Sequence, residues 1–106
     1  MTTVLIVDDD PLIAEAHRTY VERLEGFSVA AVAHTAREAV QAATRATTTD
    51  APIDLVLLDL GLPDASGISL ASALSGLRPA PDIIAITSER DLEMVRAAVA
   101  HGALAY

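Results

Sequence analysis

The sequence predicts an α/β fold in which a parallel sheet is covered by helices on both faces. Three observations lead to this prediction. Short apolar runs alternate with helical patterns along the chain, one run is apolar at nearly every position, and two runs end directly in acidic residues. Alternating strands and helices are typical of parallel sheets with right-handed crossovers, and near-continuous apolar strands are typical of sheets buried on both faces.

The first strand and helix occupy the start of the chain. Residues 4–7 form an apolar run that ends in three consecutive acids at residues 8–10. Asp10 is expected to cap a helix with Pro11 in its first turn, and Gly26 is expected to end that helix. Its apolar residues follow a helical spacing: Leu12, Ile13, Ala16, Tyr20, Val21 and Leu24.

The second strand covers residues 27–33 and is rich in alanine, so we expect it near an edge of the sheet. Thr35 and Glu38 have the spacing of a capping box, which predicts a second helix from this point. That helix has a face of small residues: Ala36, Ala39, Val40 and Ala43. The polar residues 46–52 are expected to form an exposed, mobile loop.

The third strand is predicted to be central, because residues 53–58 are apolar at nearly every position. Asp59 ends this run and a turn follows. Asp64 or Ser66 is expected to start a third helix, and Asp64 is interpreted as a structural residue. The apolar face of the helix consists of Ile68, Leu70, Ala71, Leu74 and Leu77.

A fourth strand over residues 82–87 ends in Thr87. Ser88 and Asp91 suggest the cap of a fourth helix, whose inner face is Leu92, Val95, Ala98 and Val99. Residues 103–106 look like the start of a fifth strand. Five such units favour a flavodoxin-like, doubly wound parallel sheet with the strand order 2-1-3-4-5.

The composition limits the functional classes. The chain has 106 residues, 52% of them apolar and 21% charged, as in a globular domain with one core. A net charge of -8 argues against a nucleic-acid surface within these residues. The sequence has no cysteine for a disulfide or thiolate metal site. Because its apolar start is short and is followed at once by acids, we expect neither a signal peptide nor a membrane span. We expect one cytoplasmic domain over residues 1–106, without membrane contact.

Polar side chains end the three strands that should be central neighbours. Asp8 and Asp9 follow the first strand, Asp59 the third and Thr87 the fourth. Since parallel strands place their carboxyl ends at one edge, these groups should face one pocket. Clustered carboxylates repel one another, and Mg²⁺, which prefers oxygen ligands, would relieve that repulsion. An aspartate nucleophile beside Mg²⁺ and a hydroxyl donor would suit phosphoryl transfer, whereas the simpler interpretation of Asp59 is a turn-capping acid.

Ordered motifs cover nearly the whole chain. They are the segment 7–11, the segment 57–64 continuing to Gly67, the segment 86–88, and Gly102-Ala103 leading to Tyr106. In these motifs the chain resembles the receiver domains of bacterial two-component response regulators. Over residues 5–18 it most resembles the branch that works with citrate and dicarboxylate sensor kinases.

The resemblance implies a phosphorylation-controlled signalling switch rather than an enzyme, apart from its own phosphorylation and dephosphorylation. Its partners would be a cognate sensor histidine kinase, a second copy in a homodimer, and DNA only through an output domain outside these residues. The implied roles are the following: Asp59 accepts the phosphoryl group; Asp9 binds Mg²⁺ directly, Asp8 through water and Gly61 through its carbonyl; Thr87 contacts the phosphoryl oxygens; and Tyr106 is the switch aromatic.

The resemblance also implies a lysine about three residues beyond Tyr106, at the end of the fifth strand, and a further helix after it. We therefore expect the chain to be truncated in or before the fifth strand and to lack the last helix. The lysine would neutralise phosphoryl charge in the family.

Two other functional classes are considered. A hydrolase of small phosphate esters with an aspartate nucleophile would need a second aspartate where Gly61 stands. A nucleotide- or flavin-binding module would need a glycine-rich phosphate loop where the acids at 8–10 stand. No metal or phosphotransfer role is assigned to His17, His34 or His101.

Overall fold

The computed structural model describes residues 1–86 and 103–105. In this part of the chain five strands form one parallel sheet in the order β2-β1-β3-β4-β5, which confirms the predicted order. The strands are β1 (Thr2–Val7), β2 (Phe27–Ala33), β3 (Leu55–Asp59), β4 (Asp82–Ile86) and β5 (Ala103–Ala105). The expected helix after Ser88, and the residues Thr87 and Tyr106, lie outside the described residues.

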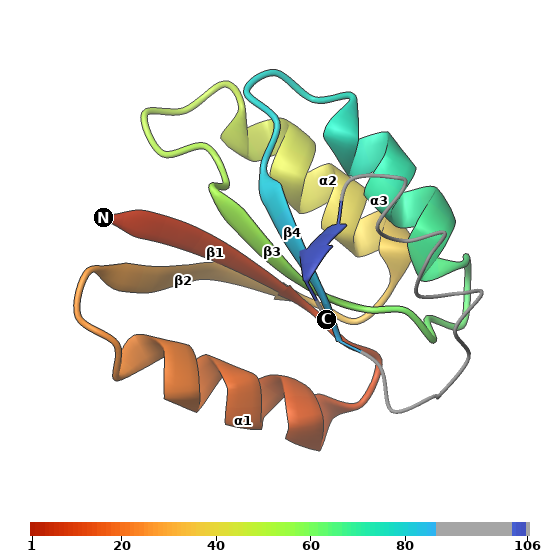
Figure 1. The fold of residues 1–106 in the computed structure, drawn as a ribbon, viewed down its shortest axis with the longest axis horizontal. Helices are drawn as coiled ribbons and strands as arrows, with labels where there is room; N and C mark the ends of the chain where they lie inside the picture. The colour runs from red at the N-terminus through yellow and green to blue at the C-terminus, as the bar shows by residue number, and fades with distance from the viewer. Residues whose placement is uncertain (87–102, 106) are drawn as a thin grey trace.

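Three helices in the described part cover the two faces of the sheet. They are α1 (Pro11–Glu22), α2 (Ala36–Ala46) and α3 (Gly67–Ser75). Figure 1 shows α1 on one face and α2 with α3 on the other. None of the helices in residues 1–86 has the length and apolarity needed to span a bilayer.

Strand β1 contributes to both hydrophobic layers, because its successive side chains point to opposite faces. Val4 and Ile6 pack with Ala14 and Val21 on the α1 side. Leu5 and Val7 belong to the larger cluster under α2 and α3, which includes Val56, Leu58, Leu70, Leu74 and Ile83. Burying a side chain of this size stabilises the fold by roughly 1.5–3 kcal/mol. The alanine-rich β2 is an edge strand, as predicted.

In α1 the helical spacing predicted the helix but not the face that it buries. Ala14 and Val21 are buried, whereas Leu12 and Tyr20 are 82% and 66% exposed. The two buried residues are seven apart, so they lie on one stripe of the helix that reaches the sheet. Leu12 and Tyr20 lie outside that stripe, although the sequence pattern placed them among the same apolar residues as Val21.

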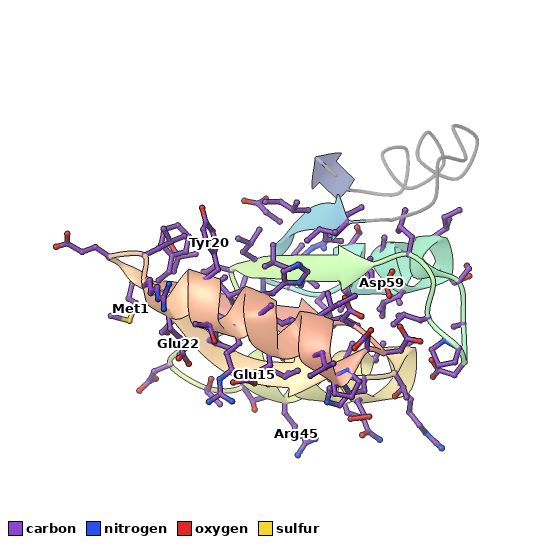
Figure 2. All side chains as sticks on the ribbon, turned by 90° about the horizontal axis from the view of Figure 1, so that it is seen from below. Met1, Glu15, Tyr20, Glu22, Arg45 and Asp59 are labelled. Atoms are coloured by element: carbon purple, nitrogen blue, oxygen red, sulfur yellow. The ribbon has the colours of Figure 1, made fainter. Side chains whose placement is uncertain are left out.

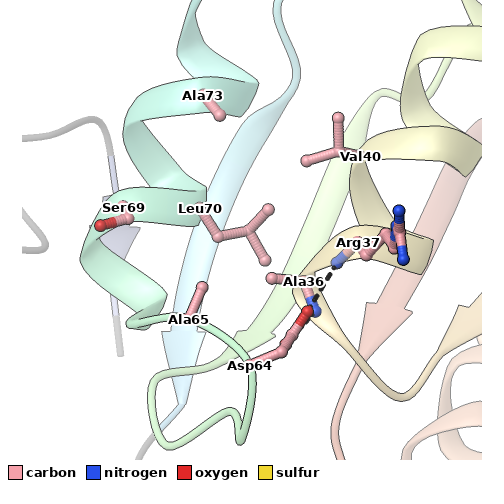
Figure 3. A pocket seen from close by; sticks show the side chains of 8 residues that line it. All are labelled: Ala36, Arg37, Val40, Asp64, Ala65, Ser69, Leu70 and Ala73. Atoms are coloured by element: carbon pink, nitrogen blue, oxygen red, sulfur yellow. Dashed lines mark hydrogen bonds between the residues drawn. The ribbon is translucent and has the colours of Figure 1, made fainter.

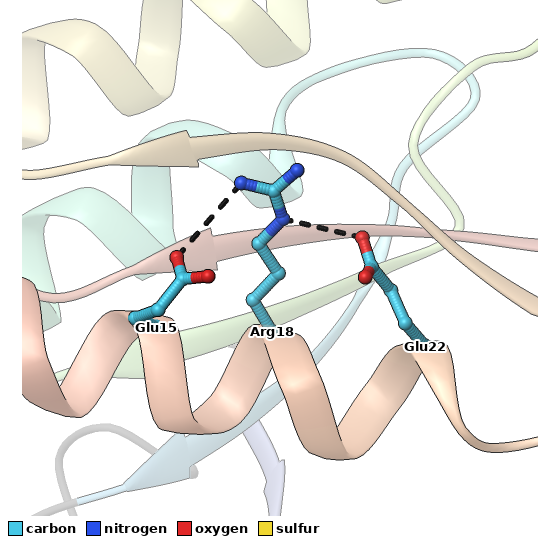
Figure 4. A network of polar contacts seen from close by, with 3 residues as sticks. All are labelled: Glu15, Arg18 and Glu22. Atoms are coloured by element: carbon cyan, nitrogen blue, oxygen red, sulfur yellow. Dashed lines mark hydrogen bonds and ion pairs between the residues drawn. The ribbon is translucent and has the colours of Figure 1, made fainter.

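The solvent side of α1 carries an ion-pair network (Figure 4). Arg18 lies 3.2 Å from Glu22 and 3.8 Å from Glu15. These side chains are about half exposed, so each pair contributes only about 0.3–0.5 kcal/mol. The network supports the helix and has no bearing on the acidic edge of the sheet.

The predicted caps are observed at α1 and α2, and at α3 one of the two predicted alternatives is observed. The Asp10 carboxylate accepts hydrogen bonds from the first turn of α1, and the Thr35 hydroxyl accepts one from Glu38 in α2. Helix α3 is capped by Ser66, whose hydroxyl accepts from the Ser69 N–H at 3.0 Å. The alternative start of this helix at Asp64 is wrong, because that carboxylate contacts α2 instead.

Candidate functional site

Asp59 lies at the carboxyl edge of the sheet. Figure 2 shows it at the tip of the β3 arrow, at the end of the molecule away from Met1. Strands β1 and β3 are paired in parallel, with Val7 opposite Leu58. The residues that follow Val7 therefore emerge beside Asp59, which brings acids from distant parts of the sequence together.

Three carboxylates converge at this edge. One oxygen from each of Asp8, Asp9 and Asp59 lies within 4.8 Å of the other two. Asp8 is buried, Asp59 half-buried and Asp9 exposed, so the cluster opens to solvent on one side. A set of hard oxygen donors at this spacing fits a divalent cation such as Mg²⁺. The predicted convergence of the first and third strands is thus observed, while Thr87 cannot be compared because it lies outside the described residues.

Hydrogen bonds hold both the backbone and the side chain of Asp8 in place. Its N–H donates to the Ala33 carbonyl at 3.0 Å, and its Oδ1 accepts from the Asp10 N–H at 2.9 Å. His34 Nδ1 lies 2.9 Å from the Asp8 carbonyl oxygen, and because a carbonyl only accepts, this nitrogen carries the proton. His34, for which no metal or phosphotransfer role is predicted, thus contacts the backbone of the acidic cluster. Its position directly after a strand, at the same edge as the acids, was the available signal.

Gly61 fixes the orientation of the Asp59 carboxylate. Its N–H donates to Asp59 Oδ1 at 3.0 Å in the turn that follows β3. This bond limits rotation of the carboxylate and places Gly61 next to the acidic cluster. The role of its carbonyl as a metal ligand stays a prediction.

Helix α3 begins against the end of β3. The Gly67 N–H donates to the Leu60 carbonyl at 3.2 Å. A Cβ atom at Gly67 would lie 2.5 Å from Leu60 Cα and 2.7 Å from Leu60 Cδ2. The close approach of α3 to the residue after Asp59 thus requires glycine at position 67.

The electrostatic environment disfavours a charged Asp59 while no cation is bound. Burial raises the pKa of Asp59, the Gly61 hydrogen bond lowers it, and the negative charges of Asp8 and Asp9 raise it again, with a net upward shift. Since its folded-state pKa lies above the unfolded one, the ionised carboxylate destabilises the fold at neutral pH. That penalty disappears as the pH falls through the folded pKa to the unfolded one.

Removing this charge is expected to stabilise the protein in a chelator. Asp59→Asn keeps an acceptor for the Gly61 N–H and should raise the free energy of unfolding at pH 7, by no more than about 1 kcal/mol, the usual upper size of interactions between solvent-exposed charges. Urea denaturation followed by circular dichroism measures this, with Asp50→Asn in the exposed loop as a neutral control. A loss of stability in Asp59→Asn would contradict the expected repulsion.

The chain as a whole matches a known protein family. The model of the response regulator receiver domain matches residues 4–106. The transcriptional regulatory protein DcuR of Shigella flexneri is 35% identical over 106 residues, and the probable C4-dicarboxylate response regulator DctR of Priestia megaterium is 34% identical over 104. The matches cover 100% and 98% of this chain and 43% of each relative. The chain thus spans less than half the length of these two relatives.

A solved structure shares the fold. The crystal structure of a response regulator protein from Burkholderia pseudomallei, with a phosphorylated aspartic acid, calcium ion and citrate, matches with a TM-score of 0.84 at 28% identity. The match covers 100% of this chain and 58% of that one. Since the family model extends from β1 to the last residue and the sheet has the order that the resemblance implied, the chain belongs to the receiver domains of response regulators.

Proposed function

We propose that this chain is a phosphorylation-controlled switch whose acceptor is Asp59. A sensor histidine kinase would donate the phosphoryl group from its phosphohistidine. The observation that carries the proposal is the convergence of Asp8, Asp9 and Asp59, with one oxygen from each within 4.8 Å of the others. A phosphorylated aspartic acid and a calcium ion in the structure from Burkholderia pseudomallei support the same chemistry here.

The residues of the site divide the work of the transfer. An Asp59 carboxylate oxygen attacks phosphorus and forms a P–O bond, the P–N bond of the phosphohistidine breaks, and the departing imidazole nitrogen takes the electron pair. Asp8, Asp9, Asp59 and the Gly61 carbonyl would hold Mg²⁺, and a cation held there would neutralise charge on the transferred group. The Gly61 N–H keeps the Asp59 carboxylate oriented during approach. Thr87 would contact the phosphoryl oxygens. Tyr106 would be the aromatic side chain that changes position when Asp59 is phosphorylated.

The output is proposed from the relatives. Because the named relatives are more than twice as long and one is a transcriptional regulatory protein, we infer that a DNA-binding domain outside these residues reads the switch. Such a regulator would act in the cytoplasm and could pair as a homodimer. The chain itself would turn over no external substrate, apart from acquiring and losing its own phosphoryl group.

Intact-mass analysis of the full chain with phosphoramidate and Mg²⁺ tests the proposal. We expect one phosphoryl group on the wild type and none on Asp59→Asn, because asparagine lacks the nucleophilic carboxylate. Asp50→Asn, which changes an exposed aspartate in the loop between α2 and β3, should accept phosphate like the wild type. Turnover of many phosphate esters without an adduct would instead favour the hydrolase alternative.

A further inference from the structure

Asp64 joins the loop after β3 to the first turn of α2 (Figure 3). Its Oδ1 accepts a hydrogen bond from the Ala36 N–H at 2.8 Å, and its Oδ2 accepts from the Arg37 N–H at 3.1 Å. The first N–H groups of a helix have no acceptor within the helix. Thr35 satisfies a different donor, the Glu38 N–H at 3.1 Å. The N-terminal end of α2 is therefore capped twice, once by Thr35 directly before the helix and once by Asp64 from the loop between β3 and α3.

The charge of Asp64 suits this position. Hydrogen bonds from Ala36 and Arg37, together with the Arg37 charge, hold the pKa of Asp64 below its ordinary value. The carboxylate is thus ionised at neutral pH, and charge-assisted hydrogen bonds at the positive end of a helix are stronger than neutral ones. Although Asp64 is exposed, both of its oxygens are occupied by α2.

The same loop carries a residue of the acidic site. Gly61, whose N–H is bonded to Asp59, precedes Asp64 by three positions. Leu62 between them is buried, and Pro63 has a fixed φ angle. The segment 61–64 is therefore held to Asp59 at one end and to α2 at the other.

These contacts connect the acidic cluster to the start of α2 from two sides. On one side His34 Nδ1 donates to the Asp8 carbonyl, and α2 begins two residues later. On the other side Asp64 returns from α2 to the loop that holds Gly61 and, through it, Asp59. The carboxylates of Asp8 and Asp59 lie close together and complete the circuit.

We propose that Asp64 is a positioning residue for cation binding and phosphoryl acceptance at Asp59, acting by tying the Gly61-bearing loop to the start of α2. Its removal leaves the carboxylate ligands in place but lets the loop and the Gly61 backbone move. Removing Asp64 should therefore lower the affinity for the cation less than removing one of the ligands would. This inference rests on the proposed function and goes beyond it by adding a residue that touches neither the cation nor the phosphoryl group.

The test compares two variants that weaken the same helix end. Asp64→Ala removes the contacts to the loop, whereas Thr35→Ala removes a cap of α2 without touching the loop. Mg²⁺ affinity is measured by calorimetric titration with Mg²⁺ alone, and phosphorylation by the rate of reaction with phosphoramidate, both in the full chain. Asp64→Asn, which keeps one acceptor oxygen, serves as the conservative variant and covers the case in which Asp64→Ala folds poorly.

We expect both Asp64→Ala and Thr35→Ala to lower the melting temperature, because each leaves helix donors without an acceptor. Of these two variants, Asp64→Ala alone should raise the Mg²⁺ dissociation constant, by roughly 3- to 10-fold, somewhat less than the usual effect of removing a direct partner of a ligand. Asp64→Asn should lie between it and the wild type. The phosphorylation rate at subsaturating Mg²⁺ should fall in the same order.

Equal Mg²⁺ affinities in Asp64→Ala and Thr35→Ala, with a wild type that binds Mg²⁺ and accepts phosphate, would overturn the inference and leave the proposed function standing. The same holds if Asp64→Asn, folded like the wild type, matches it in affinity and rate while Asp64→Ala does not fold. A wild type that neither binds Mg²⁺ nor accepts phosphate would defeat the proposed function itself, and the inference with it.

Discussion

Replacing Gly67 by alanine is expected to lower the free energy of unfolding by about 3 kcal/mol or more, at the upper end of the range for overpacked sites. The new Cβ would lie 2.5 Å from Leu60 Cα, so backbone rather than a flexible side chain must give way. Leu60 is itself buried and directly follows Asp59. Urea denaturation measures the loss, and phosphorylation at low temperature would show whether the acceptor is displaced as well.

Gly76→Ala is the matched control for this substitution. An added Cβ there would meet its nearest neighbour, the Ala73 carbonyl oxygen, at 3.4 Å, and the Gly76 backbone is already in the right-handed helical region. We expect a change of less than about 1 kcal/mol, as for glycine replacements at unstrained positions. A Gly67→Ala protein as stable as Gly76→Ala would show that α3 can shift away from β3 at little cost.

Replacing Asp9 by alanine is expected to weaken Mg²⁺ binding strongly, whereas replacing its neighbour Asp10 is not. Asp9→Ala removes one of the three oxygen donors and should weaken Mg²⁺ binding by roughly 100-fold, since even an outer partner of a ligand can contribute 10- to 100-fold. Phosphorylation by phosphoramidate should then require much higher Mg²⁺. Calorimetric titration measures the Mg²⁺ affinity, and intact mass at several Mg²⁺ concentrations measures how phosphorylation depends on Mg²⁺.

Asp10→Ala removes a neighbouring charge of the same sign but a different contact. Asp10 caps α1 through the Leu12 and Ile13 N–H groups, and its own N–H, which alanine retains, donates to Asp8. The variant should lose about 1 kcal/mol of stability and keep its Mg²⁺ affinity within a few-fold. Similar losses of Mg²⁺ affinity in the two variants would mean that general negative charge, and not ligation by Asp9, attracts the cation.

The sequence was informative where a pattern is local. Alternating apolar runs and helical spacings predicted the strands and the described helices, because each depends on residues a few positions apart. The order of the strands followed instead from the topology that five alternating strand–helix units favour. The convergence of Asp8, Asp9 and Asp59 also followed, since parallel pairing brings strand ends together whatever lies between them. The assignment of chemical roles to these acids is a further step, which the experiments above address.

Contacts set by tertiary packing were not predictable in the same way. Asp64 precedes α3 in a position that could have capped it, yet it bonds α2, which lies 28 positions earlier at Ala36. His34 reaches the Asp8 carbonyl across 26 positions. Similarly, the apolar residues of α1 do not reveal that Leu12 points to solvent, because the angle at which a helix crosses the sheet is set by the packing of both layers.

Strand β1 supplies side chains to both hydrophobic layers, and this has a consequence for how the molecule opens. If water reaches the hydrophobic cluster on either face of the sheet, it also reaches one side of β1. The α1 side and the side of α2 and α3 therefore cannot unfold independently. Amide protons of β1 should therefore exchange with deuterium only through global unfolding, whereas those of the outer strand β2 should exchange through smaller fluctuations. Asp8 and Asp9 directly follow the strand that is expected to exchange most slowly, so the acidic cluster would be attached to the part of the molecule that unfolds last.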